Sequence, residues 1–226
     1  MTILCIETST SICSAAICID GMLAEQCICN EGSNHARLLP RYIEQLLQSA
    51  KKNHWAIDAV AVSEGPGSYT GLRIGTSTAK GLCYGLHIPL IPIPTLQIIA
   101  AAAIAQIDDP NALLYPMIDA RRMEVYTAPY TTALQATSPV QAAIVDESFA
   151  QLPSAAPIYY FGDGAAKCQS VLTQWHFIPD IVPQAQYMGA LAEKAEKHIN
   201  GAEIAYFEPF YLKEFVAAQS HVKGLK

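Results

Sequence analysis

The sequence predicts an α/β protein made of two similar halves, each built around a mixed β-sheet. One observation is the order of apolar runs and amphipathic stretches, which is strand, strand, strand, helix, strand, helix and begins again after about residue 107. Another is that the first expected strand of each half ends in an acid, Glu7 and Asp119. We therefore expect an N-terminal lobe at 1–106 and a smaller lobe at 107–226, whose C-terminal tail can pack back on the first lobe.

The first lobe is expected to open with three antiparallel strands, at 2–6, 12–19 and 22–28. Between the second and third strands, Asp20 and Gly21 suit a two-residue hairpin turn, because both central residues of that turn need positive φ.

The first helix is predicted by apolar residues that recur at helical spacing between Leu38 and Leu47. Ser33 or Asn34 can cap its start. Pro40 removes a backbone donor inside this pattern, so we expect a kink or a late helix start there.

A glycine-rich loop follows the next expected strand, 58–63. The string Gly65-Pro66-Gly67-Ser68-Tyr69-Thr70-Gly71 leads into a helix that runs to about Gly85. Glycine costs roughly 1 kcal/mol per residue relative to Ala in a helix, so the excess of glycine indicates a packing or functional reason. A strand at 88–93 and a helix that Thr95 caps, to about 106, complete this half.

The second half repeats the order with shorter elements. Strands are expected at 112–118, 124–131, 140–145 and 158–161, helices after the third strand, from about 165 and at 188–198, and an extended segment at 203–215.

The composition limits the class of protein. Hydrophobic residues make up 51% of the 226 residues and charged ones 15%, so a large core or a partner must cover much of the surface. The longest apolar stretch, 86–105, is interrupted by prolines and polar residues, so no membrane span is expected. The start lacks the pattern of a secretory signal, and we expect a cytoplasmic protein.

The net charge and the cysteines further limit the possible ligands of the protein. A net charge of -6 weakens the attraction to nucleic acid, so any RNA contact needs a local basic patch or a partner. The seven cysteines are an odd number, most of them in apolar runs, and none forms C-x-x-C. We expect reduced, packed cysteines and no zinc site.

The loop at 65–71 is a candidate anion site. It joins a buried strand to a helix start, where backbone N–H groups and the positive helix end favour an anion. It lacks the Lys of a Walker loop and the third glycine of a dinucleotide fingerprint. A tight turn that packs the helix on the sheet explains the loop equally well. The candidates for a remnant phosphate site are Glu7, Thr8, Ser9, Gly65, Gly67 and Ser68.

Other polar residues leave alternatives open. His35 has Leu39 at i+4 in place of a second histidine, so we expect a surface or capping role and no metal site. Glu7 can either hold a metal-bound water or cap the turn that follows it. The turn at 119–122, Asp-Ala-Arg-Arg, is read as a salt-bridged hairpin rather than as a functional loop. A Ser/His/Asp or Cys/His triad stays open because its members can be distant in sequence, although no G-x-S-x-G elbow supports one.

Five segments together resemble the TsaB family, also called YeaZ. They are Ile3-Leu4-Cys5-Ile6-Glu7-Thr8-Ser9-Thr10, Asn34-His35-Ala36-Arg37-Leu38-Leu39-Pro40, Gly65 to Gly75, Ile118-Asp119-Ala120-Arg121-Arg122-Met123-Glu124-Val125-Tyr126 and Glu208-Pro209-Phe210-Tyr211-Leu212. The resemblance runs over essentially the whole chain, and the glycine string is its most specific part.

The resemblance implies a two-lobed fold of the actin, sugar-kinase and Hsp70 type with duplicated ribonuclease H-like units. It also implies a non-catalytic subunit that pairs with TsaD, its larger paralogue, and works with the ATPase TsaE to make N6-threonylcarbamoyladenosine at position 37 of tRNA. We expect no cofactor, contact with tRNA only through the complex, and a homodimer of the isolated chain. The partner contacts are expected at Leu38, Leu39, Tyr42, Ile43, Arg73, Ile74, Ser77, Thr78 and Gly81.

Departures from the family pattern bear on the rival functions. The family commonly has Asp where this chain has Glu7, and the catalytic paralogue has an H-x-x-x-H metal pair where this chain has only His35. The leading rival is a glycoprotease-like, M22-type peptidase that acts on its paralogue. A small-molecule kinase is disfavoured, because the turn at 119–121 is not a D-x-G phosphate loop and 162–164, Gly-Asp-Gly, is a thin remnant of an adenosine motif.

Overall fold

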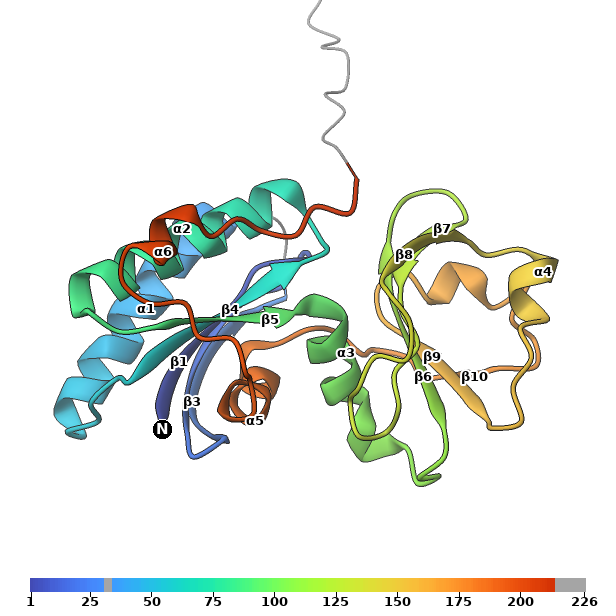
Figure 1. Ribbon diagram of the computed structural model, residues 1–226, viewed down its shortest axis with the longest axis horizontal. Coiled ribbons are helices and arrows are strands. Elements are labelled where there is room, and N and C mark those ends of the chain that lie inside the picture. The colour runs from blue at the N-terminus through green and yellow to red at the C-terminus, as the bar shows by residue number, and fades with distance from the viewer. Residues whose placement is uncertain (31–33, 214–226) are drawn as a thin grey trace, which may run out of the picture.

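The computed structural model describes residues 1–30 and 34–213. Within them the chain forms two five-stranded sheets, one in each lobe (Figure 1). The first sheet contains β1 (Thr2–Glu7), β2 (Cys13–Ile19), β3 (Met22–Cys29), β4 (Ala59–Gly65) and β5 (Leu90–Pro94). The second contains β6 (Leu113–Asp119), β7 (Glu124–Thr127), β8 (Gln141–Ile144), β9 (Ile158–Phe161) and β10 (His176–Phe177).

The two sheets share one strand order, β3-β2-β1-β4-β5 in the first and β8-β7-β6-β9-β10 in the second. In each lobe the first strand is central, pairs antiparallel with the second strand and parallel with the fourth. This repeated topology confirms the predicted two-lobed fold of the actin, sugar-kinase and Hsp70 type. Glu7 and Asp119 end the two central strands and so occupy matching places.

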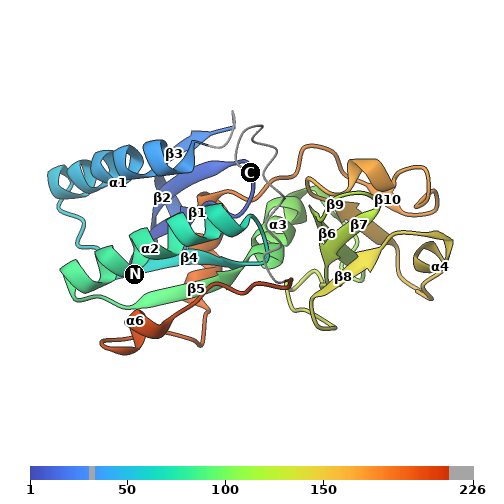
Figure 2. The ribbon, with the colours of Figure 1, turned by 90° about the horizontal axis from the view of Figure 1, so that it is seen from above.

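Helices cover both faces of the first sheet. α1 (His35–Lys52) and α2 (Tyr69–Leu86) lie on one face, and the 3-10 helix η3 (Ala185–Met188) with α5 (Gly189–Glu193) lies on the other (Figures 1 and 2). α3 (Thr95–Ala103) packs on β6 and lies between the sheets (Figure 1). The shorter elements are η1 (Ile104–Gln106), α4 (Glu147–Ala150), η2 (Ala166–Cys168) and α6 (Glu203–Tyr206).

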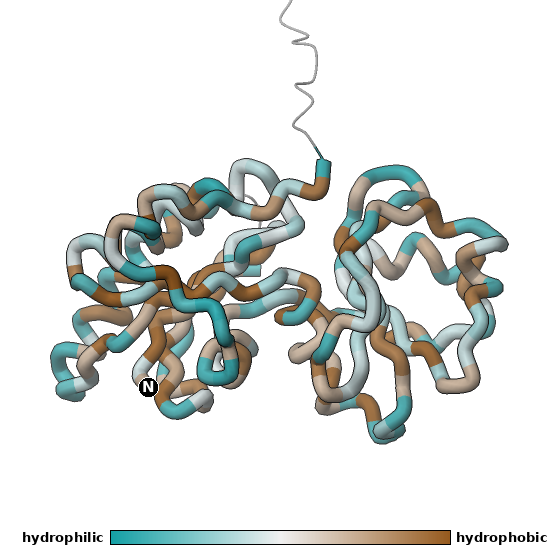
Figure 3. Tube along the Cα trace, viewed as in Figure 1, coloured by the Kyte–Doolittle hydropathy of each residue, from teal (hydrophilic) through white to brown (hydrophobic). Residues whose placement is uncertain are grey.

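The strands of the first sheet are apolar on both faces because both faces are covered. Leu4 and Ile6 of β1 pack with the apolar faces of α1 and α2, whereas Ile3 and Cys5 pack with Met188. Successive residues of a strand point to opposite faces, so each strand serves two cores. The hydropathy trace shows hydrophobic segments on the strands and also on the helices that cover them (Figure 3).

One local prediction is confirmed, and two further observations concern the cysteines and the helices. Asp20 and Gly21 both have positive φ, 51° and 78°, in the turn between β2 and β3. None of the seven cysteines forms a disulfide bond. No helix in the described residues has the length and apolar character needed to cross a membrane.

The first helix differs from one part of the expectation. α1 begins at His35 and continues through Pro40, so the late start at the proline is wrong. Asn34 precedes the helix but its side chain makes no capping hydrogen bond, and Ser33 lies outside the described residues. The helix tolerates the proline because its apolar face, with Leu39 and Leu46 fully buried, fixes it to the sheet.

The second half contains less regular structure than the sequence predicts. The strand expected at 124–131 ends at Thr127, and Pro129, which has no N–H, follows it. The helix expected from about 165 is the single turn η2, after which bonds between residues three apart continue, such as Val171 N–H to Cys168 O at 3.0 Å.

The C-terminal elements also differ. The helix expected at 188–198 is only α5, because the chain then turns so that Ile199 pairs with Leu90 at the edge of the first sheet. The extended segment at 203–215 contains α6, and its residues 214 and 215 lie outside the described part.

Candidate functional site

The turn after β1 lies directly on the glycine loop before α2. The Ser68 N–H donates to the Ser9 carbonyl over 2.6 Å, and the Thr8 hydroxyl donates to the Gly71 carbonyl over 2.8 Å. Glycine is required for this approach, since a Cβ on Gly67 would lie 2.4 Å from the Ser9 carbonyl oxygen and one on Gly71 2.0 Å from that of Thr8. The Ser68 N–H, at the start of α2, is a donor that could bind an anion, but it already donates to the chain's own backbone.

Two further contacts fix the loop. The Ser68 hydroxyl caps α2 by accepting from the Gly71 N–H at 3.2 Å. Gly65 has φ 118° and packs on the C-terminal segment, where a Cβ would lie 2.4 Å from the Phe210 carbonyl oxygen. These contacts support the tight-turn interpretation of the loop, and anion binding there stays a prediction.

Glu7 is a fully buried acid beside this contact. Its Oε1 accepts from the Ser9 N–H at 2.6 Å, which caps the turn, whereas Oε2 has no hydrogen-bond partner among the described residues. Burial raises the pKa of Glu7 to about 7. The neighbouring hydroxyls of Ser9 and Ser63 oppose this rise, although neither reaches hydrogen-bond geometry. Glu7 is therefore part protonated at neutral pH.

His35 is buried at the start of α1. Its Nε2 lies 3.1 Å from the Ile12 carbonyl oxygen, so the ring ties α1 to the start of β2 and the predicted surface or capping role is wrong. Leu39, one turn further, is fully buried in the core. In residues 1–30 and 34–213 no group of three or more His, Cys, Asp or Glu side chains could hold a metal ion.

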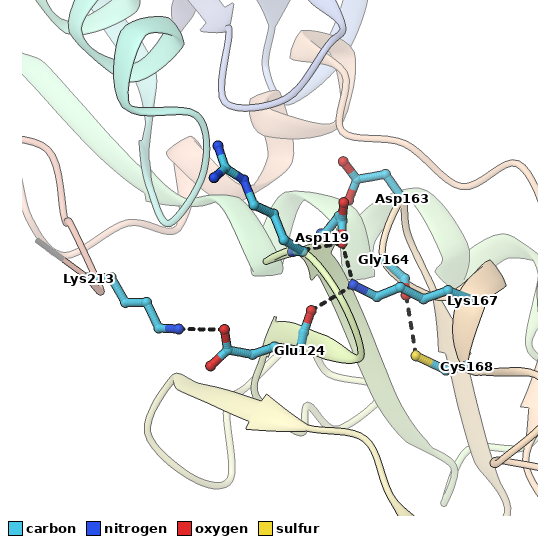
Figure 4. A network of polar contacts seen from close by, with 8 residues as sticks. Asp119, Glu124, Asp163, Gly164, Lys167, Cys168 and Lys213 are labelled. Atoms are coloured by element: carbon cyan, nitrogen blue, oxygen red, sulfur yellow. Dashed lines mark hydrogen bonds and ion pairs between the residues drawn. The ribbon is translucent and has the colours of Figure 1, made fainter. Parts of the chain in front are cut away.

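In the second lobe Asp119 occupies the place that Glu7 has in the first. Its carboxylate forms an ion pair with Lys167, which also donates to the Glu124 carbonyl at 2.7 Å (Figure 4). The Asp119 N–H donates to Asp163 Oδ1 at 3.1 Å. The predicted salt-bridged hairpin is therefore present, but its cation is Lys167 from beyond β9 and not one of the adjacent arginines.

An apolar groove of about 650 Å³ runs between α1 and α2. We call it the α1–α2 groove. Among its lining residues are Pro40, Leu47 and Leu82 and four of the predicted partner residues, Ile43, Ser77, Thr78 and Gly81.

The other predicted partner residues lie around the groove with different exposure. Leu38, Tyr42 and Ile74 are half-buried and pack against the core of the first lobe. Arg73 is exposed, and its guanidinium donates to the Tyr69 hydroxyl at 2.6 Å. Leu39 is fully buried on the face of α1 that packs against the core, so it has no surface for a partner and its predicted contact is wrong.

Comparison with known proteins agrees with the resemblance. A family model described as "TsaD: tRNA N6-adenosine threonylcarbamoyltransferase" matches residues 30–218. The protein described as "tRNA threonylcarbamoyladenosine biosynthesis protein TsaB" in Haemophilus influenzae is 36% identical over 126 residues, 56% of this chain and 52% of the relative. The TsaB protein of Escherichia coli is 36% identical over 130 residues, 58% of this chain and 55% of the relative. The chain belongs to the TsaB family.

A solved structure supports this membership along the length of the chain. The structure described as YeaZ from Pseudomonas aeruginosa is 26% identical, has a TM-score of 0.76, and is matched over 93% of this chain and 99% of its own. The chain spans about half the length of the curated TsaB relatives it matches in sequence.

The sequence did not indicate two lysines of the second-lobe network. Lys167 and Lys213 pair with Asp119 and Glu124 across 48 and 89 residues of chain. In the sequence only Asp119, the acid that ends the first strand of the second lobe, indicated this site. The two lysines could not be predicted, because helical or strand periodicity carries no information on partners so far apart in the chain.

Proposed function

We propose that this chain is a non-catalytic, cytoplasmic subunit of an assembly that makes N6-threonylcarbamoyladenosine in tRNA. In this proposal it pairs with TsaD and works with the ATPase TsaE, and it forms a homodimer when TsaD is absent. Membership of the TsaB family supports the reaction. The observation that carries the pairing is the α1–α2 groove.

The glycines of α2 support a partner on this face. No atom lies within 4 Å of a Cβ added to Gly81 or Gly85, so the chain's own packing does not require glycine at either position. Each glycine nevertheless costs about 1 kcal/mol of helix stability relative to Ala. A partner helix that packs closely on the α2 backbone would explain why both positions are glycine.

The remnant loops support an accessory role rather than a catalytic one. The Ser68 N–H is engaged by Ser9, and the Asp119 carboxylate is engaged by Lys167. Both groups stand where the lobes of this fold type can hold a nucleotide phosphate. The peptidase alternative has no matching observation in the described residues.

Pairing is tested with Gly81→Arg, which places a long cation in the groove. The position is open within the chain, so the variant is expected to fold, whereas charges at Leu38 or Tyr42 would also disturb the core. Ser170→Arg adds the same charge to an exposed site of the second lobe and is the matched control.

The measurements are co-elution with TsaD and the threonylcarbamoyladenosine content of tRNA after incubation with TsaD and TsaE. The wild-type chain and Ser170→Arg are expected to co-elute and to support the reaction, and Gly81→Arg to do neither while it retains its melting transition. Normal pairing by a folded Gly81→Arg would place the interface elsewhere. Cleavage of TsaD by the wild-type chain would favour the peptidase.

A further inference from the structure

The turn between β6 and β7 holds two arginines in a conformation that arginine rarely adopts. Arg121 and Arg122 have φ values of 71° and 50°, the left-handed region in which glycine and asparagine are favoured. The hairpin turn between β2 and β3 in the first lobe, by contrast, uses Asp20 and Gly21, which suit positive φ. Local backbone preference therefore opposes arginine at 121 and 122, which indicates that the side chains have a use.

Three hydrogen bonds fix the backbone of this turn. The Arg121 N–H donates to Asp119 Oδ1 at 3.0 Å, the Glu124 N–H donates to the Arg121 carbonyl at 3.1 Å, and the Ala120 N–H donates to the Glu124 carbonyl at 3.1 Å. A fixed turn presents its two side chains from a defined place, so less conformational freedom is lost when they bind.

Two of the three carboxylates beside the turn are already paired with lysines, and the third, Asp163, accepts from the Asp119 N–H. Asp119 pairs with Lys167 and Glu124 pairs with Lys213 (Figure 4). Both arginine side chains are exposed, and neither guanidinium has an ion-pair or hydrogen-bond partner within residues 1–30 and 34–213. The positive charge of the pair is therefore available to a ligand, in a chain whose net charge is -6.

The turn lies beside the C-terminal segment of the chain, which packs on the first lobe. Lys213 follows a segment that is held on the first lobe by the Phe210 N–H to Glu64 carbonyl bond of 2.7 Å and by the ring of Tyr211 at 4.9 Å from that of Tyr69. The Lys213 to Glu124 ion pair connects that segment to the start of β7. A ligand at the turn would thus lie beside both lobes, at the carboxyl end of the central strand β6.

We propose that Arg121 and Arg122 bind phosphate groups of the tRNA backbone. This inference rests on the proposed function, which supplies tRNA as the polyanion. A guanidinium binds a phosphate through two parallel N–H bonds, and arginine suits this contact better than lysine does. The pair is the local basic patch that an acidic chain needs in order to contact RNA.

The test replaces the two side chains by residues that fit the turn, Arg121→Asn with Arg122→Gly. Because both replacements adopt positive φ at low cost, we expect the melting temperature to rise by about 2–4 °C. The control, Lys52→Gln with Lys194→Gln, removes two exposed positive charges elsewhere.

Binding is measured by fluorescence anisotropy on the full chain assembled with TsaD, using a labelled tRNA transcript with adenosine at position 37. The arginine variant is expected to bind about tenfold more weakly, with a slope of log affinity against log salt concentration smaller by about 1 to 2. The control variant is expected to lose much less affinity, and titration with ATP to be unchanged.

Equal tRNA affinity of the arginine variant and the wild type would overturn the inference. The inference is equally overturned if the variant keeps its affinity for tRNA but no longer binds TsaD, because the arginines would then be a protein contact. It is also overturned if the only change in the variant is weaker binding of ATP. A wild-type assembly that forms no threonylcarbamoyladenosine would refute the proposed function instead, so the two failures are distinguishable.

Discussion

Glu7 is expected to make the stability of this protein depend on pH in a way that one substitution removes. The side chain is fully buried, and its burial raises the pKa from 4.5 to about 7. As the pH rises through 4.5 the unfolded chain releases this proton while the folded chain keeps it. The folded state then binds more protons than the unfolded state, so the free energy of unfolding falls with rising pH.

The fall begins near pH 4.5 and ends near pH 7, where the folded state also releases the proton. A pKa difference of this size corresponds to about 3 kcal/mol, because each pKa unit is worth about 1.4 kcal/mol. This is a large part of the stability of a typical domain, about 5–15 kcal/mol. Glu7→Gln keeps the shape of the side chain but cannot ionise, so it lacks this dependence.

The assay is urea unfolding of the wild type, of Glu7→Gln and of the exposed control Glu196→Gln at several values between pH 4.5 and pH 8. The stability of Glu7→Gln relative to the wild type is expected to increase by about 3 kcal/mol over this range, while Glu196→Gln follows the wild type. Parallel curves for wild type and Glu7→Gln would refute the reasoning. If Glu7→Gln fails to fold, the carboxyl carbon of Glu7 in the wild type, followed by NMR, must titrate near pH 7.

Two further outcomes follow from the contacts of the turn and the glycine loop. Gly71→Ala is expected to lower the free energy of unfolding by about 2 kcal/mol or more, because its Cβ would lie 2.0 Å from the Thr8 carbonyl oxygen. Gly81→Ala in the same helix is expected to raise the free energy of unfolding by about 0.5–1 kcal/mol, since its Cβ meets no other atom. Urea unfolding in which both variants shift in the same direction would contradict this. The isolated chain is expected to bind ATP weakly or not at all in calorimetric titration, because the Ser68 N–H and the Asp119 carboxylate are engaged within the chain, and stoichiometric micromolar binding would revive the kinase reading.

The sequence by itself determined the order of the strands along the chain in each lobe, the hairpin at Asp20-Gly21 and the family. These follow from patterns that are local, because strand alternation, helical spacing and turn residues act over a few neighbours. The glycine string predicted a close contact as well, since a Cβ added to Gly71 would lie only 2.0 Å from the Thr8 carbonyl oxygen. The helices of the second half were predicted too long, because such local patterns do not include contacts between distant segments. One such contact is the pairing of Ile199 with Leu90 at the sheet edge, which follows the end of α5.

Only the tertiary structure decided which charged groups meet and which side chains are buried. Lys167 reaches Asp119, and this leaves Arg121 and Arg122 without a partner in the described residues. The burial of His35 and Leu39 on the inner face of α1, and the raised pKa of Glu7, likewise depend on segments far away in the chain. The physical reason is that ion pairing and desolvation are set by distances in space, and a sequence pattern specifies only distances along the chain.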